Sequence, residues 1–206
     1  MPARSSDGLP MWWMDVLDAE GNPTEDRVTT KNYAQASRYE QGSALPLFYG
    51  GLTNTFEYNG ISFSFFFYYS YGGKNYDYTM STISHDGSSP GTQLIADELN
   101  SWTPTNTNTD IPVFIPNNSY NGNARSTRFL FDGSYVRLKN VTLAYSFPES
   151  LLTRIKLSGA RVYVQGENLL TFTEHKGLGP EVGLSGFDDN DVPNAKTITF
   201  GLSFDF

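Results

Sequence analysis

Side chains able to perform chemistry are sparse in this chain. It has no cysteine, which removes thiol catalysis and cysteine zinc sites, and its two histidines are His85 and His175. Neither histidine has a serine nearby in the nucleophile-elbow context that a catalytic triad would require. Acidic residues occur, but no two of them stand out as the facing carboxylates of a glycosidase. The sequence therefore predicts no enzyme activity and no cofactor.

One run of oxygen-bearing side chains could hold a metal ion. Asp188, Asp189, Asn190 and Asp191 are consecutive, and clustered hard oxygen atoms are what calcium prefers. The run lacks the ligand spacing of an EF-hand loop. We therefore interpret it as a solvated loop and predict no metal site.

Three tryptophans are candidates for contact with a ligand or a partner. Trp12, Trp13 and Trp102 could stack on sugar rings or meet another protein, because aromatic faces offer broad apolar contact area. All three lie in polar stretches that we expect to be outer loops. The alternative interpretation is that they pack those loops together.

Two cations lie in a segment of alternating polarity and could also contact a ligand. These are Arg137 and Lys139. They could instead sit at the level of lipid headgroups, or pair with acids on the same face such as Glu167. The sequence leaves these interpretations open.

The composition narrows the class of protein. The formal net charge is −8, so the basic footprint of a nucleic-acid-binding protein is absent. Charged residues make up 17% and aromatic residues 15%, whereas soluble domains carry about 25% charge. The chain contains no run of 18 apolar residues, so the sequence predicts no transmembrane helix. The first ten residues lack the pattern of a secretory signal, for which truncation is the simplest explanation.

The elements that would position these residues are long strands of alternating polarity. We expect them at 47–58, 61–71, 134–147, 160–172 and 196–206. In 61–71 and in 196–206 one face is wholly apolar or aromatic, which requires either a deep core or lipid. Asn59-Gly60 between the first two is a strong hairpin signal. The alternation slips near Asn140, which predicts a bulge or the end of a strand.

The connections between these strands alternate in length. Those at 59–60 and 148–156 are short, with one helical turn at 148–152, whereas 72–131 and 173–195 are long and polar. Residues 1–46 read as an extracellular loop region with a turn or hairpin tip at 18–23. An up-and-down barrel has short periplasmic turns and long outer loops, and its strands cross the membrane in about 9–11 residues. The pattern predicts an all-β, antiparallel transmembrane barrel segment over 47–206, with Asn59-Gly60 and Phe206 on the periplasmic side.

Four motifs in order resemble one family. They are Ser134–Tyr145 (SYVRLKNVTLAY), Ala160–Phe172 (ARVYVQGENLLTF), Lys176–Glu181 (KGLGPE) and Thr197–Phe206 (TITFGLSFDF). Leu47–Leu52 and Gly72–Lys74 look like the family's earlier strand and loop entry. Together they resemble the C-terminal part of SusC/RagA-type TonB-linked outer-membrane proteins.

The resemblance implies a barrel of about 22 strands with an N-terminal plug, of which this chain would carry roughly the last five strands. It implies TonB-driven import of oligosaccharides or peptides across the bacterial outer membrane, with the TonB complex acting through an N-terminal part absent from this sequence. It also implies a SusD-like surface lipoprotein as partner. Four residues resemble the C-terminal signal read by the barrel-assembly machinery: Phe200, Leu202, Phe204 and Phe206.

Two other hypotheses stay open. The first is a soluble carbohydrate-binding β-sandwich of a secreted protein, which requires the Phe-rich faces of 61–71 and 196–206 to pack against each other. The second is a structural barrel that imports nothing. Strand length and the asymmetry of the connections favour lipid contact over the sandwich.

Overall fold

The computed structural model describes residues 5–153, 156–177, 179–188 and 191–206. The chain separates into two compact units. The first, here called the sheet unit, consists of Ser43–Asn75, Asp132–Gly186 and Asp191–Phe206. The second, here called the loop unit, consists of Met1–Gly42, Tyr76–Phe131 and Phe187–Asn190.

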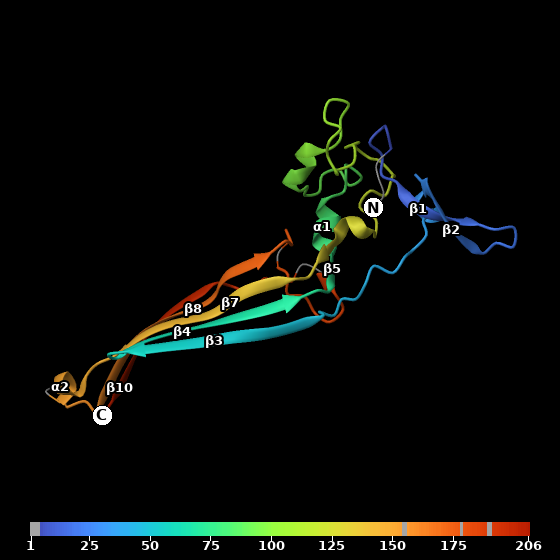
Figure 1. Cartoon of the computed structure of the whole chain (residues 1–206). Helices are drawn as coiled ribbons and strands as arrows, with labels where there is room; N and C mark the ends of the chain where they lie inside the picture. The colour runs from blue at the N-terminus through green and yellow to red at the C-terminus, as the bar shows by residue number, and fades with distance from the viewer. Residues whose placement is uncertain (1–4, 154–155, 178, 189–190) are drawn as a thin grey trace. The chain divides into compact units, whose positions relative to one another are not determined.

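The sheet unit is built on one five-stranded sheet (Figure 1). Its order is β10-β8-β7-β4-β3, and every neighbouring pair is antiparallel. The strands are β3 (Phe48–Tyr58), β4 (Ile61–Tyr71), β7 (Tyr135–Ser146), β8 (Gly159–Thr173) and β10 (Thr197–Asp205). Strands that follow one another in the sheet also follow one another in the chain, so the predicted up-and-down arrangement is confirmed.

The hairpin signal between β3 and β4 is confirmed in detail. Tyr58 pairs with Ile61, which leaves Asn59 and Gly60 as a two-residue turn. Both have positive φ, 48° at Asn59 and 81° at Gly60, as a type I′ turn requires. A side chain at Gly60 would also collide with the backbone, because its Cβ would lie 2.6 Å from the carbonyl oxygen of Ser146.

A bulge explains the slip in polarity near Asn140. The β7 register shifts opposite Phe66 and Phe67 in β4, and shifts again toward β8 between Leu138 and Asn140. Lys139 is the extra residue, so the strand changes phase there. Leu138 and Val141 therefore lie on one face although they are three residues apart. The predicted bulge is confirmed, and it keeps the apolar face of β7 continuous.

The remaining elements of the sheet unit lie at its turns. α2 (Glu149–Leu152) is the predicted single helical turn between β7 and β8, and Leu152 is its buried residue. We call the end of the sheet that carries α2, Asn59-Gly60 and Phe206 the turn end. The opposite end, from which the connections after β4 and β8 depart, is the loop end.

The Phe-rich strands do not face each other. β4 and β10 belong to the same sheet, with β7 and β8 between them. Side chains of two strands in one sheet cannot form the two facing layers of a sandwich. The β-sandwich hypothesis is therefore wrong for the sheet unit.

The loop unit contains more regular structure than its sequence predicts. Residues 1–46 were expected to be loop, yet β1 (Trp12–Leu17) and β2 (Pro23–Thr30) form an antiparallel hairpin. The predicted tip is confirmed, since the Asp18 amide donates to the Asn22 carbonyl over 2.9 Å. Short, exposed strands with weak alternation give little signal in a sequence, which explains the difference.

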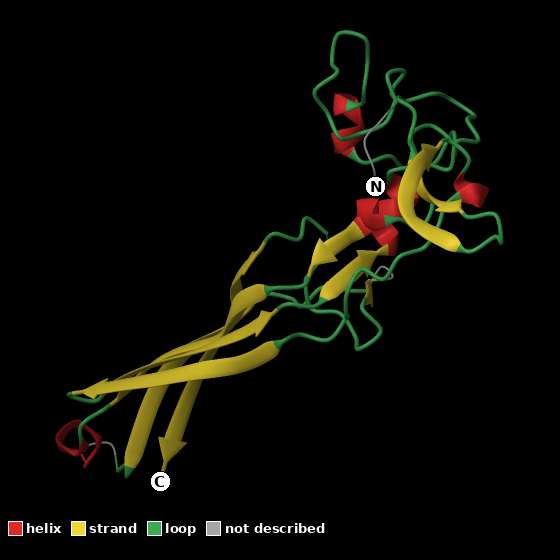
Figure 2. Cartoon of the chain, turned by 45° about the vertical axis from the view of Figure 1, so that its right-hand side comes forward, coloured by secondary structure: helices red, strands yellow, loops and turns green. Residues whose placement is uncertain are grey.

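The rest of the loop unit consists of short elements joined by long loops (Figure 2). β9 (Phe187–Asp188) pairs in parallel with the Tyr76–Asp77 end of β5 (Lys74–Asp77), and β6 (Leu130–Asp132) lies on the other side of β5. The helices are η1 (Tyr33–Gln35), α1 (Tyr78–Ile83), η2 (Ala96–Asn100) and η3 (Thr127–Phe129). Among the described residues, no helix has the length and apolarity needed to cross a membrane.

Candidate functional site

One face of the five-stranded sheet is apolar and exposed. Its members alternate along every strand, and cross-strand neighbours share the face: Phe63 lies between Phe56 and Leu143, and Leu202 opposes Val162. Its exposed side chains include Leu52, Phe56, Ile198, Phe200, Leu202 and Phe204. A monomeric soluble protein rarely exposes so large a continuous apolar patch.

Aromatic side chains border this apolar face at both ends. Tyr58, Tyr145 and Phe147 lie at the turn end, where the rings of Tyr145 and Phe147 meet edge to face at 5.1 Å. Phe48 and Tyr71 lie at the loop end and are stacked at 5.0 Å. Aromatic girdles of this kind mark the two interfaces of a membrane-spanning barrel.

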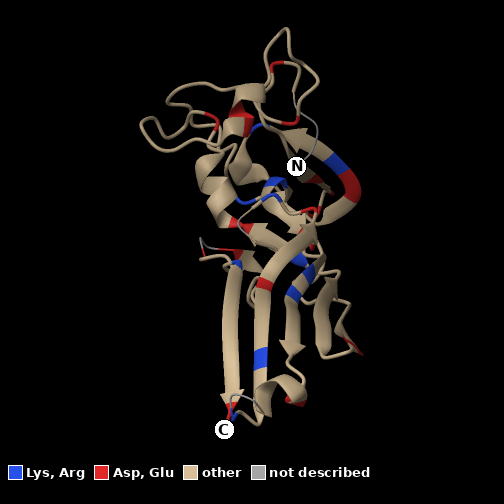
Figure 3. Cartoon of the chain, turned by 90° about the vertical axis from the view of Figure 1, so that its left-hand side faces the viewer, with Lys and Arg blue, Asp and Glu red and all other residues tan. Residues whose placement is uncertain are grey.

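The opposite face of the sheet is polar. On β10 it carries Thr197, Thr199, Gly201, Ser203 and Asp205, and the residues that oppose them on β8 are Glu167, Gln165, Tyr163, Arg161 and Gly159. Figure 3 shows how few charged residues the long strands carry. β4 has none at all.

Glycines make room for aromatic rings on the polar face. A Cβ at Gly201 would lie 2.1 Å from Cζ of Tyr163, and a Cβ at Gly51 would lie 2.4 Å from Cε2 of Phe66. Each glycine sits one strand away from its ring, so the ring lies flat across the neighbouring strand. The rings therefore lie along the polar face of the sheet instead of projecting from it.

One charged cluster stands on the polar face toward the loop end. Arg137 donates from Nη1 to Oε2 of Glu181 at 2.5 Å, and Lys139 donates from Nζ to Oε1 at 3.2 Å. Arg137 is buried, whereas the side chains of Lys139 and Glu181 remain partly exposed. The sequence suggested Glu167 as the acid for these cations, but the acid they contact is Glu181 of the connection between β8 and β10.

The loop unit holds a second charged cluster, which is buried. Arg128 forms two bonds to Asp86, Nη1 to Oδ2 at 2.6 Å and Nη2 to Oδ1 at 2.9 Å, and its Nη2 reaches Oε1 of Glu98 at 3.3 Å. Two carboxylates thus share one guanidinium. Burial, followed by the neighbouring Asp86, raises the pKa of Glu98 from 4.5 to about 7, although Arg128 acts in the opposite direction.

The three tryptophans occupy different environments. Trp12 is 5% exposed and packs edge to face on Tyr33 at 5.4 Å. Trp102 is half-buried, and its ring covers Gly8, where a Cβ would lie 2.5 Å from Cδ2. Trp12 and Trp102 therefore pack against other residues of the loop unit, as the alternative interpretation of the tryptophans expects. Trp13 is 42% exposed on β1, so a role in ligand or partner contact stays a prediction for this side chain.

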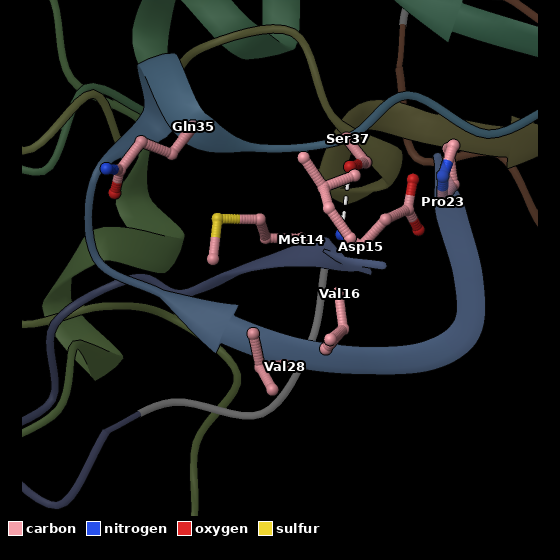
Figure 4. Close-up of a pocket in the computed structure, with 8 residues that line it drawn as sticks. Met14, Asp15, Val16, Pro23, Val28, Gln35 and Ser37 are labelled. Carbon is pink, nitrogen blue, oxygen red and sulfur yellow. Dashed lines mark hydrogen bonds between the residues drawn. The ribbon is translucent and has the colours of Figure 1, made fainter. Parts of the chain in front are cut away.

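The hairpin that carries Trp13 also borders a shallow groove (Figure 4). The lining is mainly apolar, and the Asp15 amide donates to Oγ of Ser37 at 3.0 Å across one side. Its lining residues are Met14, Asp15, Val16, Leu17, Pro23, Val28, Gln35 and Ser37.

The remaining predicted sites are a surface strip and an acidic run. Phe200, Leu202, Phe204 and Phe206, predicted as the assembly signal, are exposed on one side of β10 and beyond its end. In the acidic run, Asp189 and Asn190 lie outside the described residues. Asp188 is buried and Asp191 is exposed.

The sequence missed the partners in both charged clusters. Arg137 and Glu181 are 44 positions apart, and Arg128 and Asp86 are 42 apart. Each cluster joins residues through irregular loops, which carry no periodicity from which proximity could be inferred. A basic residue inside a strand that is otherwise apolar or neutral was the available signal for the first cluster.

A single sheet with an apolar, girdled face and a polar face defines part of a transmembrane β-barrel. The comparisons with known proteins agree. TonB-dependent receptor P3 of Formosa agariphila is 37% identical over 182 residues, which cover 83% of this chain and 17% of that protein. TonB-dependent receptor SusC of Bacteroides thetaiotaomicron is 30% identical over 199 residues, which cover 94% of this chain and 19% of SusC.

Solved structures agree with these sequence relatives. A structure of the RagAB peptide transporter matches with a TM-score of 0.77 and 30% identity, over 96% of this chain and 21% of that chain. The open-open state of the RagAB peptide importer matches with a TM-score of 0.77 and 29% identity, over 98% and 21%. No protein-family model matches the chain.

The chain belongs to the SusC/RagA family of TonB-dependent receptors, whose members reside in the bacterial outer membrane. Its relatives are receptors and transporters, not enzymes. The chain spans 17–19% of the length of the curated relatives named here.

Proposed function

We propose that the sheet unit forms five neighbouring strands in the wall of a closed barrel that imports nutrients across the outer membrane. The observation that carries the proposal is the division of the sheet into two faces. The apolar, girdled face would contact lipid, and the polar face with its flat rings would line the lumen or meet a plug. A barrel of about 22 strands would place these five at its C-terminal end.

The edges of the sheet support closure by further strands. Among the described residues, β3 pairs with β4 alone and β10 pairs with β8 alone. In hydrocarbon each unpaired backbone group costs several kcal/mol, so an open edge cannot persist there. Strands from the part of the receptor outside this chain would pair with β3 and β10.

The relatives suggest the cargo and the partners. The solved RagAB structures are titled as a peptide transporter and a peptide importer, and we propose that the whole receptor takes up peptides or oligosaccharides. A SusD-like surface lipoprotein would meet the outer loops, with Trp13 as one contact. The TonB complex would act through residues outside this chain, and the barrel-assembly machinery would read the strip from Phe200 to Phe206.

Neighbouring cysteines on β10 test the wall assignment, because the chain itself has no cysteine. Phe200→Cys and Thr199→Cys are introduced separately into the whole receptor in outer-membrane vesicles. Position 200 should react with a membrane-soluble maleimide, and position 199 with a small water-soluble maleimide. Tyr58→Cys, at the turn end of the same face, serves as a control near the interface. Equal access of the water-soluble reagent to positions 199 and 200 would contradict the assignment.

A further inference from the structure

The charged cluster on the polar face has more positive than negative charge. Arg137 and Lys139 share the single carboxylate of Glu181, so the hydrogen-bonded group carries one unbalanced positive charge. Asn194 adds a neutral bond, donating from Nδ2 to Oε2 of Glu181 at 2.9 Å. A hydrogen-bonded cluster with a net positive charge attracts anionic groups.

The two cations are held in place by the strands. Arg137 donates from Nε to Oγ1 of Thr171 at 3.1 Å and lies 5.3 Å from the ring centre of Tyr135. Lys139 lies 4.6 Å above the ring of Tyr68, and the rings of Tyr68 and Tyr135 are 5.8 Å apart. A fixed guanidinium, a nearby ammonium and an aromatic floor together suit a carboxylate that is attached to an apolar or sugar body.

The acid that fills this position comes from a loop. Glu181 lies in the connection between β8 and β10, and its side chain is 37% exposed. The loop is tied to the sheet unit beside it, where Asn75 donates from Nδ2 to the carbonyl oxygen of Pro180 at 2.9 Å. The hydrogen bond at Pro180 does not involve Glu181. The Glu181 side chain can therefore separate from Arg137 and Lys139 while Pro180 stays bound to Asn75.

We propose that Arg137 and Lys139, above the rings of Tyr68 and Tyr135, form a subsite for a carboxylate of the transported compound, which Glu181 occupies when the compound is absent. This rests on the proposed function, because it requires the polar face to be the lumen. Exchange of one carboxylate for another conserves charge and hydrogen bonds. Contacts of the ligand's body with the partly exposed ring of Tyr68 would then favour the ligand, and the segment directly after Glu181, which includes Leu184, would loosen.

The test uses the whole receptor in detergent, with a spin label on Leu184→Cys. Leu184 is 86% exposed in the same loop, so a label there reports loop mobility without disturbing the cluster. The probes are an N-acetyl tripeptide with a free C-terminal carboxylate, the same tripeptide as its amide, a galacturonate trimer and a galactose trimer. The acid probes should bind and mobilise the label, whereas the amide and the galactose trimer should not. The two acids then distinguish a peptide from a sugar source of the carboxylate.

Variants identify the residues responsible. Lys139→Gln should weaken binding of the acid probe about tenfold through loss of one charge-assisted hydrogen bond. Glu181→Gln should mobilise the label without ligand and strengthen acid binding, because the internal competitor is lost. Arg161→Gln, which removes a cation from the same face of β8, should change neither measurement.

Two results overturn the subsite. One is equal binding of the acid and amide probes, and the other is acid binding that Lys139→Gln leaves unchanged. Either result leaves the wall assignment intact if positions 199 and 200 show the expected labelling pattern. If that labelling pattern fails, the proposed function itself is overturned, so the two failures are distinguishable.

Discussion

Tyr163 lies across Gly201. The two residues are directly opposed in the β8–β10 ladder, and the phenol ring fills the space that a side chain at position 201 would need, with Cζ 2.1 Å from the Cβ position. The backbone at position 201 does not itself require glycine, because its φ is not in the left-handed region. Glycine is needed there because the ring of Tyr163 leaves no space for a side chain. The ring thus lies along the polar face of the sheet.

Gly201→Val should therefore destabilise the folded sheet. The added side chain must displace the ring of Tyr163 or push the strands apart, and overpacking of this kind costs about 1–3 kcal/mol. Urea unfolding of the whole receptor in detergent measures the loss. Gly179→Val is the matched control, since a Cβ at Gly179 has nothing within 4 Å. If Tyr163→Ala fails to restore the stability of Gly201→Val, the contact is not the cause.

Much of the sheet could be predicted because one apolar face and one polar face impose a strict period of two. The strand at 61–71 has the predicted bounds, and the bulge near Asn140 was visible as a change of phase. Two-residue turns also have strong local signals, as Asn59-Gly60 shows. Local rules thus suffice wherever each residue must lie on one of two faces of different polarity.

The loops could not be predicted in the same way. The rough helical spacing of Leu94, Ile95 and Leu99 suggests a short helix over 92–100, but the structure has only η2, which begins at Ala96. Thr92 instead donates from Oγ1 to the carbonyl oxygen of Ser89 at 2.6 Å. Polar side chains such as Thr92 compete with the backbone of a helix for hydrogen bonds. The pairing of Arg128 with Asp86 depends on the path of the long loops between them, and no local sequence pattern predicts that path.

The stability of the loop unit should fall as pH rises from about 4.5 to about 7. The pKa of Glu98 is raised to about 7 by burial and by Asp86, so the folded unit keeps a proton that the unfolded chain releases near 4.5. Between these two pH values the folded state binds more protons than the unfolded state. The stabilisation that comes from the proton on Glu98 is therefore complete below about pH 4.5 and is lost as the pH rises through about 7. Hydrogen exchange of the loop unit in the whole receptor, measured across the window and corrected for the intrinsic rate, reports this change.

Variants of the two neighbouring acids check the assignment. Glu98→Gln should remove most of the pH dependence, because the amide stays neutral throughout. Asp97→Asn, at an exposed position in the same helix, should preserve it. Unchanged pH dependence in Glu98→Gln would show that another group titrates.

Arg128→Gln should weaken the loop unit strongly at neutral pH. It leaves the buried carboxylate of Asp86 without its cation, and breaking such a pair by removing one partner costs about 3–5 kcal/mol. Proteolysis of the loop unit in intact outer-membrane vesicles measures the effect, with the exposed Arg38→Gln as control. A variant as resistant to protease as the wild type would mean that water solvates the carboxylates.

Substitutions of Trp12 and Trp13 should have different effects, although the two residues are adjacent on β1. Loss of Trp12 should affect packing, and loss of Trp13 should affect binding of a partner. Trp12 is 5% exposed, so Trp12→Ala should destabilise the hairpin region by about 3–5 kcal/mol, as removal of a buried aromatic ring does. Trp13 is 42% exposed, and Trp13→Ala should leave protease resistance unchanged while weakening capture of the SusD-like lipoprotein. Pull-down of the lipoprotein with the whole receptor measures the second effect. Undiminished capture by Trp13→Ala, together with a stable fold, would remove Trp13 from the partner interface and leave the acidic tip of the hairpin as the next surface to test.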